Sequence, residues 1–333
     1  KTKGRRMFQS FPRIALFFFA IIPILLFHSN TVLAWQQPVD LSELFKKGVQ
    51  YEQSGDYEQA SEIWGQFIEI FENNLGKDDP NVSLALNRQA STLISLAKYS
   101  EAKSLILRAL SIQETKWGKD DPRLADVLNS LGLVYTELGD DKAAESLYLR
   151  SINLLENQKE PNYRLFASCL NNLARLYEAQ GKYAAAESLF RRSLEIREKK
   201  LGPEHILVAV SLNNLGELYR IKKNYKEAES LHQRALQIRQ DKLTTDHPLI
   251  AISLNYLALV HKEQKKYISA GIFYLRALRI WEKSLGTDHP DVAVCLHNLA
   301  FMYKEQGEYA SAVPLINRAI SIHTLCGVAE GRK

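Results

Sequence analysis

Apolar residues recur along most of the chain at spacings of three and four, which places them on one side of a helix. Between residues 212 and 219, for example, Leu212, Leu215, Gly216 and Tyr219 share one face, with polar residues between them. A second amphipathic stretch begins near Ala228 after a short break, and a junction with a proline usually follows. The pattern predicts pairs of antiparallel helices and indicates no β-strand.

The helix pair recurs with a period of 42 residues. One leucine and one alanine return at this spacing in seven successive copies. They are Leu44, Leu86, Leu128, Leu170, Leu212, Leu254 and Leu296, and Ala60, Ala102, Ala144, Ala186, Ala228, Ala270 and Ala312. A single pair cannot bury its own apolar face, so neighbouring copies must stack. We therefore expect an all-α solenoid of about seven helix pairs over residues 41–325, followed by a tail over 326–333 too rich in glycine for a good helix.

The junctions carry the signals of helix ends. Glycines follow several second helices, and we expect them to close these helices in the left-handed conformation. They are Gly76, Gly118, Gly202 and Gly286. The pairs Asp79-Pro80, Asp121-Pro122, His247-Pro248 and His289-Pro290 then open the next copy, with proline suited to the first helical position. This repetition predicts helix caps at His247 and His289 rather than metal ligands.

The segment Leu212-x2-Leu215-Gly216-x2-Tyr219 resembles the first half of the tetratricopeptide repeat signature, and Ala186-x3-Phe190 resembles the second half. The 42-residue period and the Asp-His-Pro junctions resemble the kinesin light chain type of this repeat. The resemblance implies a right-handed superhelix whose first helices line a concave, ligand-binding surface. It also implies a protein or peptide partner and no catalytic activity or cofactor.

Residues 1–34 differ from the rest of the chain. Residues 1–13 contain five basic residues and no acidic one, and an uncharged apolar run follows at residues 14–27. The motif Val32-x-Ala34 then suits cleavage by a signal peptidase before Trp35. We predict a signal peptide, with an uncleaved signal anchor as the alternative, and a short linker over 35–40. Met7 is a second candidate start. Either case predicts an extracytoplasmic (periplasmic or secreted) body, with the membrane touched only through residues 14–27 if they stay attached.

Charge and cysteine content exclude several classes of function. Without residues 1–34 the chain holds 38 basic and 38 acidic residues, so no net charge favours nucleic acid. An arginine ladder from Arg108 to Arg318 is accompanied by glutamates and indicates a solvated, ion-paired face. Cys169 and Cys295 share one repeat phase three copies apart, too far to pair, and we expect them to be buried. No nucleophile, phosphate-loop or metal motif is recognisable.

The first helices carry a row of asparagines where the resemblance implies a groove. Asparagine is a mediocre helix former, and its amide both donates and accepts hydrogen bonds. Two interpretations stay open: the amides hold an extended peptide, or they bond neighbouring helices and water. The predicted groove comprises Asn87, Asn129, Asn171, Asn172, Arg175, Asn213, Asn214, Arg220, Asn255, Tyr256, Lys262, His297, Asn298, Phe301 and Lys304.

Together these features predict a non-catalytic scaffold that binds a protein or peptide with apolar anchors and some acidic character. The alternatives are an enzyme with an active site hidden in the groove and a self-assembling structural protein. The last copy has no capping helix in the sequence, so we expect part of the apolar stripe along Leu315, Ile316, Ala319 and Ile322 to be exposed. We predict either self-association through this end or a native chain that continues beyond Lys333. The alternative is that the tail folds back over the stripe.

Overall fold

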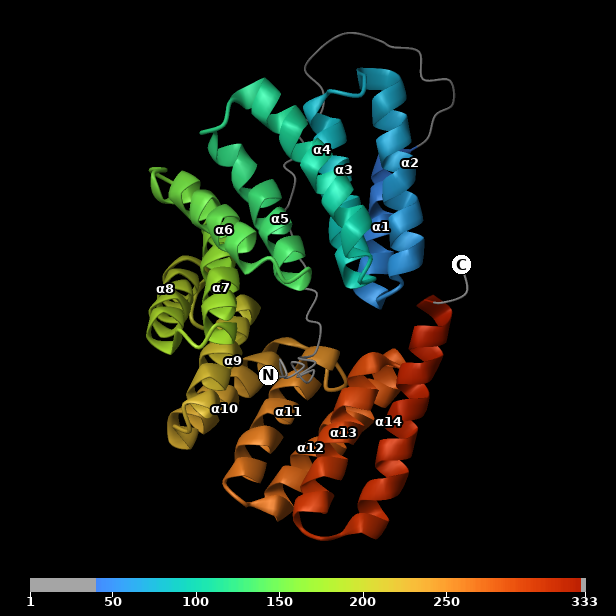
Figure 1. Ribbon diagram of the computed structural model, residues 1–333, viewed down its shortest axis with the longest axis vertical. Coiled ribbons are helices and arrows are strands. Elements are labelled where there is room, and N and C mark those ends of the chain that lie inside the picture. Colours follow the sequence, from blue (N-terminus) through green and yellow to red (C-terminus); the bar gives the residue numbers. More distant parts are fainter. Residues whose placement is uncertain (1–39, 331–333) are drawn as a thin grey trace, which may run out of the picture. The chain divides into compact units, whose positions relative to one another are not determined.

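The computed structural model describes residues 40–330, and the predicted signal segment therefore lies outside the described residues. Within that range the chain is helical throughout, with fourteen α-helices, one 3-10 turn and no strand (Figure 1). The elements are α1 (Leu41–Ser54), α2 (Tyr57–Leu75), α3 (Pro80–Ser95), α4 (Tyr99–Trp117), η1 (Pro122–Leu124), α5 (Ala125–Glu137), α6 (Asp141–Glu156), α7 (Tyr163–Ala179), α8 (Tyr183–Leu201), α9 (Ile206–Ile221), α10 (Tyr225–Lys242), α11 (Pro248–Glu263), α12 (Tyr267–Leu285), α13 (Pro290–Glu305) and α14 (Tyr309–Glu330). The predicted all-α class and its consecutive helix pairs are confirmed.

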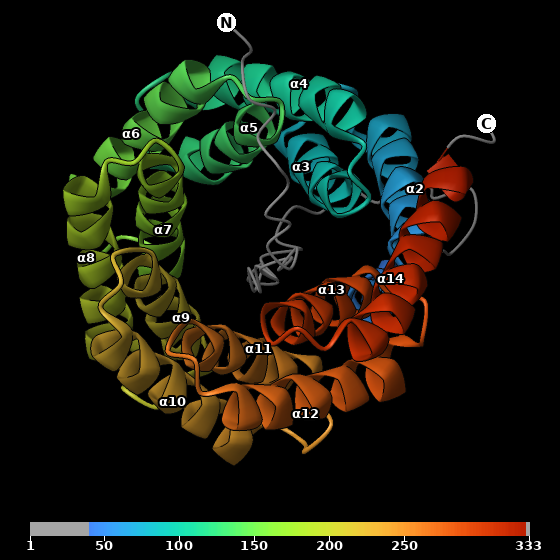
Figure 2. The same cartoon turned by 60° about the horizontal axis from the view of Figure 1, so that its bottom comes forward.

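The chain divides into two compact units, with the division inside α7. We call the described residues 40–176 the N-terminal unit and residues 177–330 the C-terminal unit. In the C-terminal unit the first helices α9, α11 and α13 lie side by side, and α10, α12 and α14 form a second layer (Figure 2). In the N-terminal unit α3 and α5 are neighbours in the same way, backed by α4 and α6.

Small residues let the two helices of a pair approach closely. All seven of the repeated alanines are buried, with exposed fractions of 0–2%. Gly132 of α5 faces Tyr148 of α6, and a Cβ atom there would lie 2.7 Å from the ring atom Cε1. Gly216 of α9 faces His232 of α10, where an added Cβ atom would lie 2.7 Å from the ring atom Cε1. The close contact buries the apolar stripes that the sequence pattern predicts.

The junctions follow the predicted capping but not the predicted glycine conformation. The Asp79 side chain accepts a hydrogen bond from the N–H of Asn81, and the rings of His247 and His289 accept from Leu249 and Asp291. The predicted capping role of both histidines is thus confirmed. The expectation that these glycines adopt the left-handed conformation is wrong. Gly76 has φ 89° and ψ 156°, an extended conformation with positive φ that is almost restricted to glycine. True left-handed residues instead follow the first helices, as at Gly55.

The C-terminal end differs from the sequence prediction in two ways. Helix α14 continues to Glu330, five residues beyond the predicted end at residue 325. Ala319 and Ile322 are buried, and Leu315 and Ile316 are half-buried, so the predicted exposed set is wrong. The exposed apolar side chains are Tyr309 (62%), Val313 (53%) and Ile320 (57%). The sequence analysis assigned exposure to the wrong face of α14, because the face that carries these four residues packs against α13.

Candidate functional site

The predicted asparagine row lies largely in the interior. Asn87, Asn129, Asn171, Asn213 and Asn255 are 0–7% exposed, as is Asn172. Except for Asn171, each of these amides forms a hydrogen bond with a neighbouring first helix. The hydrogen bonds run from Asn87 Nδ2 to Asp126 Oδ2 (2.8 Å), from Asn172 Nδ2 to Asn129 Oδ1 (3.0 Å), from Asn213 Nδ2 to Ser253 Oγ (3.2 Å) and from Asn298 Nδ2 to Asn255 Oδ1 (3.3 Å).

These contacts match the second of the two interpretations, bonding between neighbouring helices. An amide that is buried and hydrogen-bonded inside the protein has little surface left for a ligand. Asn171 differs, because neither its Oδ1 nor its Nδ2 finds a hydrogen-bond partner in the described part of the chain. The asparagines therefore act first as links between successive repeats.

The remaining predicted groove residues are more accessible. Arg175, His297, Phe301 and Lys304 are exposed. Asn214, Asn298, Arg220 and Lys262 are partly buried. Tyr256 is only 4% exposed and stacks on the ring of His232, with the ring centroids 5.0 Å apart and an interplanar angle of 3°. The predicted groove residues thus fall into two groups, one buried in the interior and a smaller one accessible to solvent.

The accessible surface of α11 and α13 includes the aromatic ring of Phe301 and the charged side chains around it. Phe301 is 42% exposed, and the Nζ atoms of Lys262 and Lys304 lie 5.0 and 5.6 Å from its ring centroid. His297 stacks loosely beside it at 6.5 Å and 21°. We name His297, Phe301, Lys304 and Lys262 the Phe301 cluster. It combines an apolar face with two ammonium groups, so it can contact an apolar side chain and a carboxylate together.

Arg220 links α9 to α11. It donates to both carboxylate oxygens of Glu217, from Nε at 2.8 Å and from Nη2 at 2.6 Å, and it also pairs with Glu263. Burial lowers the pKa of Arg220, but the hydrogen bond and charge of Glu217 and the charge of Glu263 outweigh this and raise the pKa above its ordinary value. Arg220 is already saturated with carboxylates, so it has little capacity for an anionic ligand.

A hollow of about 490 Å³ near the end of α9 is lined by several titratable side chains. Glu187 accepts hydrogen bonds from Lys222 Nζ (2.6 Å), the Tyr219 hydroxyl (2.7 Å) and Arg191 Nε (3.1 Å). The Lys222 bond is the largest cause that lowers the pKa of Glu187, to about 2. A carboxylate this acidic is a poor general base at neutral pH.

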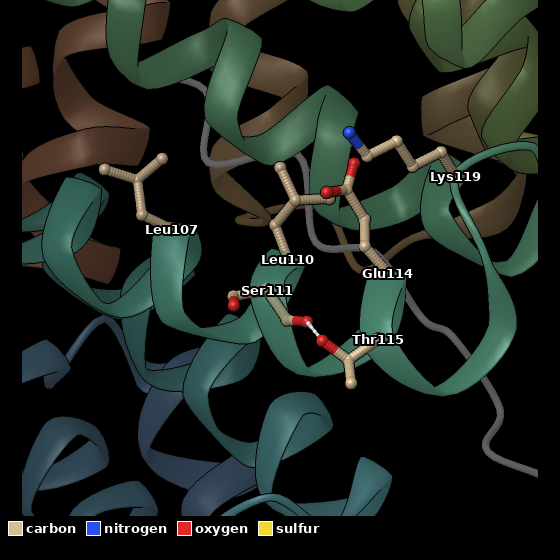
Figure 3. A pocket seen from close by; sticks show the side chains of 6 residues that line it. All are labelled: Leu107, Leu110, Ser111, Glu114, Thr115 and Lys119. Carbon is tan, nitrogen blue, oxygen red and sulfur yellow. Dashed lines mark hydrogen bonds between the residues drawn. The ribbon is translucent and has the colours of Figure 1, made fainter.

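A second hollow, of about 480 Å³, lies on α4 (Figure 3). Two of its polar groups are already used: Thr115 Oγ1 donates to the Ser111 carbonyl at 2.8 Å, and Glu114 pairs with Arg150 at 2.8 Å. Leu107 leaves 43% of its surface exposed on one wall. The hollow therefore combines an apolar wall with few polar groups, chiefly Lys119 and the Ser111 hydroxyl.

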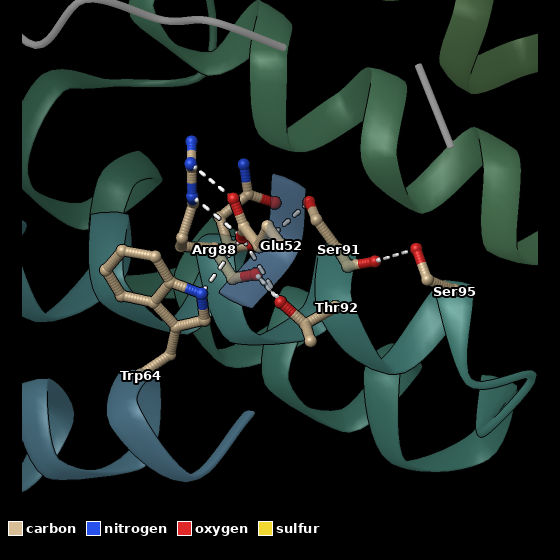
Figure 4. Close-up of polar contacts among 7 residues, drawn as sticks. Glu52, Trp64, Arg88, Ser91, Thr92 and Ser95 are labelled. Carbon is tan, nitrogen blue, oxygen red and sulfur yellow. Dashed lines mark hydrogen bonds and ion pairs between the residues drawn. The ribbon is translucent and has the colours of Figure 1, made fainter. Parts of the chain in front are cut away.

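The N-terminal unit contains a buried ion pair among α1, α2 and α3 (Figure 4). Glu52, 8% exposed, accepts from Trp64 Nε1 (2.9 Å) and from Arg88 Nη2 (2.6 Å), and Thr92 Oγ1 also donates to it (3.3 Å). The Arg88 guanidinium carbon lies 5.1 Å from the Trp64 ring centroid. These contacts hold three helices together, and neither charge is presented to a ligand.

The cysteines and histidines whose side chains the structure describes show no reactive arrangement. Cys169 and Cys295 are fully buried, as predicted, and burial raises the pKa of the Cys169 thiol to about 12. A thiol with a raised pKa is a weak nucleophile. Among residues 40–330 no three His, Cys, Asp or Glu side chains gather closely enough to hold a metal ion. In the same range no helix is both long and apolar enough to span a bilayer.

Comparison with known families settles the repeat type. The tetratricopeptide repeat profile matches residues 40–115, 84–157, 165–241 and 249–324. The chain belongs to the tetratricopeptide repeat family. No curated protein sequence matches it significantly.

Solved structures give the same fold at low sequence identity. BtubC (BKLC) from P. vanneervenii is 23% identical, with a TM-score of 0.56 over 73% of this chain and 92% of its own. A Rap protein complexed with competence and sporulation factor is 15% identical, with a TM-score of 0.63 over 85% of this chain and 74% of its own. The quorum sensor NprR from B. thuringiensis is 12% identical, with a TM-score of 0.55 over 84% of this chain and 86% of its own. The tetratricopeptide repeat predicted from the sequence is thus confirmed, and its kinesin light chain type stays a prediction.

Proposed function

We propose that this tetratricopeptide repeat protein is a non-catalytic scaffold that binds a peptide or protein segment through the Phe301 cluster. One observation carries the proposal: Phe301 is accessible and flanked by two ammonium groups on the first-helix layer. An apolar side chain next to a carboxylate is the ligand that suits such a surface. The Rap structure, solved with a bound factor, supports binding as a use of this fold.

The test is a comparative pull-down with residues 35–333 as bait, with the captured proteins quantified by mass spectrometry. Phe301→Ala combined with Lys304→Ala should reduce capture of the specific partner at least about tenfold, since aromatic and charged anchors carry most interface energy. Leu149→Ala, which alters an equally exposed apolar residue (46%) of the N-terminal unit, is the matched control and should bind as wild type. Equal losses in both variants, or none in either, would reject the Phe301 cluster.

A second proposal, self-association, rests on the exposed stripe of α14. Tyr309, Val313 and Ile320 are more than half exposed, whereas the residue equivalent to Ile320 in the preceding copy, Leu278, is 9% exposed. No other helix described in the C-terminal unit covers this face of α14. We infer that a second copy packs there. Light scattering should show a dimer at micromolar concentration that Val313→Ser with Ile320→Ser converts to a monomer, and a wild-type monomer at high concentration would refute it.

We further propose that residues 1–34 direct export, on the strength of their basic stretch, apolar run and Val32-x-Ala34 site. N-terminal sequencing of the mature protein should begin at Trp35. A full-length product that resists carbonate extraction from membranes would identify an anchor instead.

A further inference from the structure

The second helices carry a regular ladder of ion pairs on their outer side. In four copies an arginine pairs with the glutamate 36 residues before it, which lies on the preceding second helix. The pairs are Arg108–Glu72 (2.5 Å), Arg150–Glu114 (2.8 Å), Arg234–Glu198 (2.6 Å) and Arg318–Glu282 (2.6 Å). The ion-paired face predicted from the sequence is therefore present at these four rungs.

The ladder is interrupted at Arg276 of α12. The residue 36 positions earlier is Gln240, which carries no charge. Arg276 is exposed and forms no ion pair with any residue of the described chain, and the same is true of Arg279 one turn further. A guanidinium that has lost its usual carboxylate can accept one from another molecule.

The same face of α12 carries exposed apolar side chains. Ile268, Ile272 and Leu275 are 86%, 61% and 52% exposed, and with Arg276 and Arg279 they follow the i, i+4, i+7, i+8, i+11 spacing of one helix face. The equivalent positions of α10 are Lys226, Ser230 and Gln233, and those of α14 are Ala310, Pro314 and Asn317. Helix α12 lies between α10 and α14 (Figure 2), so this exposure is not caused by an open end of the array. We name Ile268, Ile272, Leu275, Arg276 and Arg279 the α12 face.

We propose that the α12 face binds an amphipathic helix of a partner protein, with aliphatic residues on Ile268, Ile272 and Leu275 and a carboxylate on Arg276. Two departures from the repeat pattern, the apolar stripe and the missing glutamate, fall on one face of one helix. An aliphatic stripe is complementary to a helix with the same spacing of apolar anchors. The uncompensated arginine then requires an acidic residue at one defined position of that helix.

A second copy of the chain fits this face poorly. Two α12 faces in antiparallel contact would bring Arg276 and Arg279 toward Lys265 and Lys266 of the other copy, which opposes like charges. The acidic outer face of α2, with Glu58, Glu62 and Glu69, has no apolar residue on the same line. A bilayer also fits less well, because the equivalent positions of α10 and α14 carry no large apolar side chain that it could bury.

The test is a selection from a displayed library of helical peptides with leucine at i, i+4 and i+7 and randomised flanking positions. The full chain is the bait, and the variant Ile272→Ser with Leu275→Gln, which introduces the polar residue types of α10, is the counter-selection. We expect Asp or Glu to be enriched at least about tenfold at one flanking position, and the selected peptides to lose at least about tenfold in affinity for the variant.

The variant Gln240→Glu isolates the role of Arg276 without changing the α12 face. It restores the glutamate found at Glu198 and Glu282, so it should re-form the internal ion pair and weaken the selected peptides about fivefold or more. Gln237→Glu on the same helix is the control and should bind as wild type. Absence of enrichment, enrichment without acidic preference, or binding to phosphatidylglycerol vesicles that Ile272→Ser with Leu275→Gln abolishes would each overturn the proposal.

Discussion

At the scale of single residues, the close approach of paired helices depends on positions without a side chain. Replacing Gly132 with alanine would place a Cβ atom 2.7 Å from Tyr148, closer than real contacts allow. We expect Gly132→Ala to lower the free energy of unfolding by about 1–3 kcal/mol, the usual cost of overpacking. Gly65→Ala, where the nearest atom would be the Gln89 amide nitrogen at 3.4 Å, should instead stabilise by up to about 1 kcal/mol. Thermal unfolding followed by circular dichroism would show shifts of opposite sign, and equal shifts would contradict the packing argument.

His232 makes the fold sensitive to acid. Burial, assisted by the charges of Arg220 and Arg239, lowers the pKa of His232 to about 3. In the unfolded chain it takes up a proton near pH 6.5, so stability is complete above that pH and falls by about 1.4 kcal/mol per unit below it. His232→Tyr, which introduces the residue found at Tyr148 and Tyr274, should remove this component. Unfolding temperatures between pH 7 and pH 5 would then fall less in the variant, and identical pH dependence would disprove the assignment.

At the scale of helices, the asparagines link successive repeats. Asn213 donates to Ser253 Oγ and its Oδ1 lies 3.0 Å from His232 Nδ1, so both ends of the amide join neighbouring helices. Asn213→Ala should cost about 1–3 kcal/mol, the penalty for leaving buried polar partners unpaired. Asn214→Ala changes the adjacent, partly exposed residue and should alter stability by no more than about 0.5 kcal/mol. Chemical unfolding of both variants tests this, and a silent Asn213→Ala would return that residue to the candidate ligand surface.

The sequence predicted the helix pairs and much of their capping, because periodicity and cap residues act within a few neighbouring positions. It did not distinguish the two uses of asparagine, since burial of Asn213 depends on the helix that stacks beside it 40 residues later. It also misassigned the exposed stripe of α14, because several faces of that helix are apolar. Phe301 was predicted as a site residue. That Lys262 of α11 and Lys304 of α13 both lie over its ring could be seen only in the tertiary structure, because the two lysines belong to different helices.

At the scale of the whole molecule, each repeat is stabilised by its neighbours in the sequence. Repeat arrays of this kind unfold by local steps rather than in one transition. Amide hydrogen exchange should therefore be fastest in α1 and α14, which are packed on one side only, and slowest in internal helices such as α4 and α11. Exchange measured by mass spectrometry on peptic fragments would show this gradient. A uniform exchange rate across the described helices would indicate cooperative unfolding and contradict it.

The sequence by itself determined the all-α class, the 42-residue repeat, the N-terminal caps at the junctions and the family, since these follow from local spacing that recurs along the chain. Only the tertiary structure decided which polar side chains are accessible. Stacking buries Asn129, Asn213 and Asn255 and leaves Phe301 and the α12 face open, because exposure depends on the neighbouring helix and not on the residue's own phase. The ladder of arginines is periodic in sequence, yet the missing partner of Arg276 has meaning only once α10 is seen to lie beside α12.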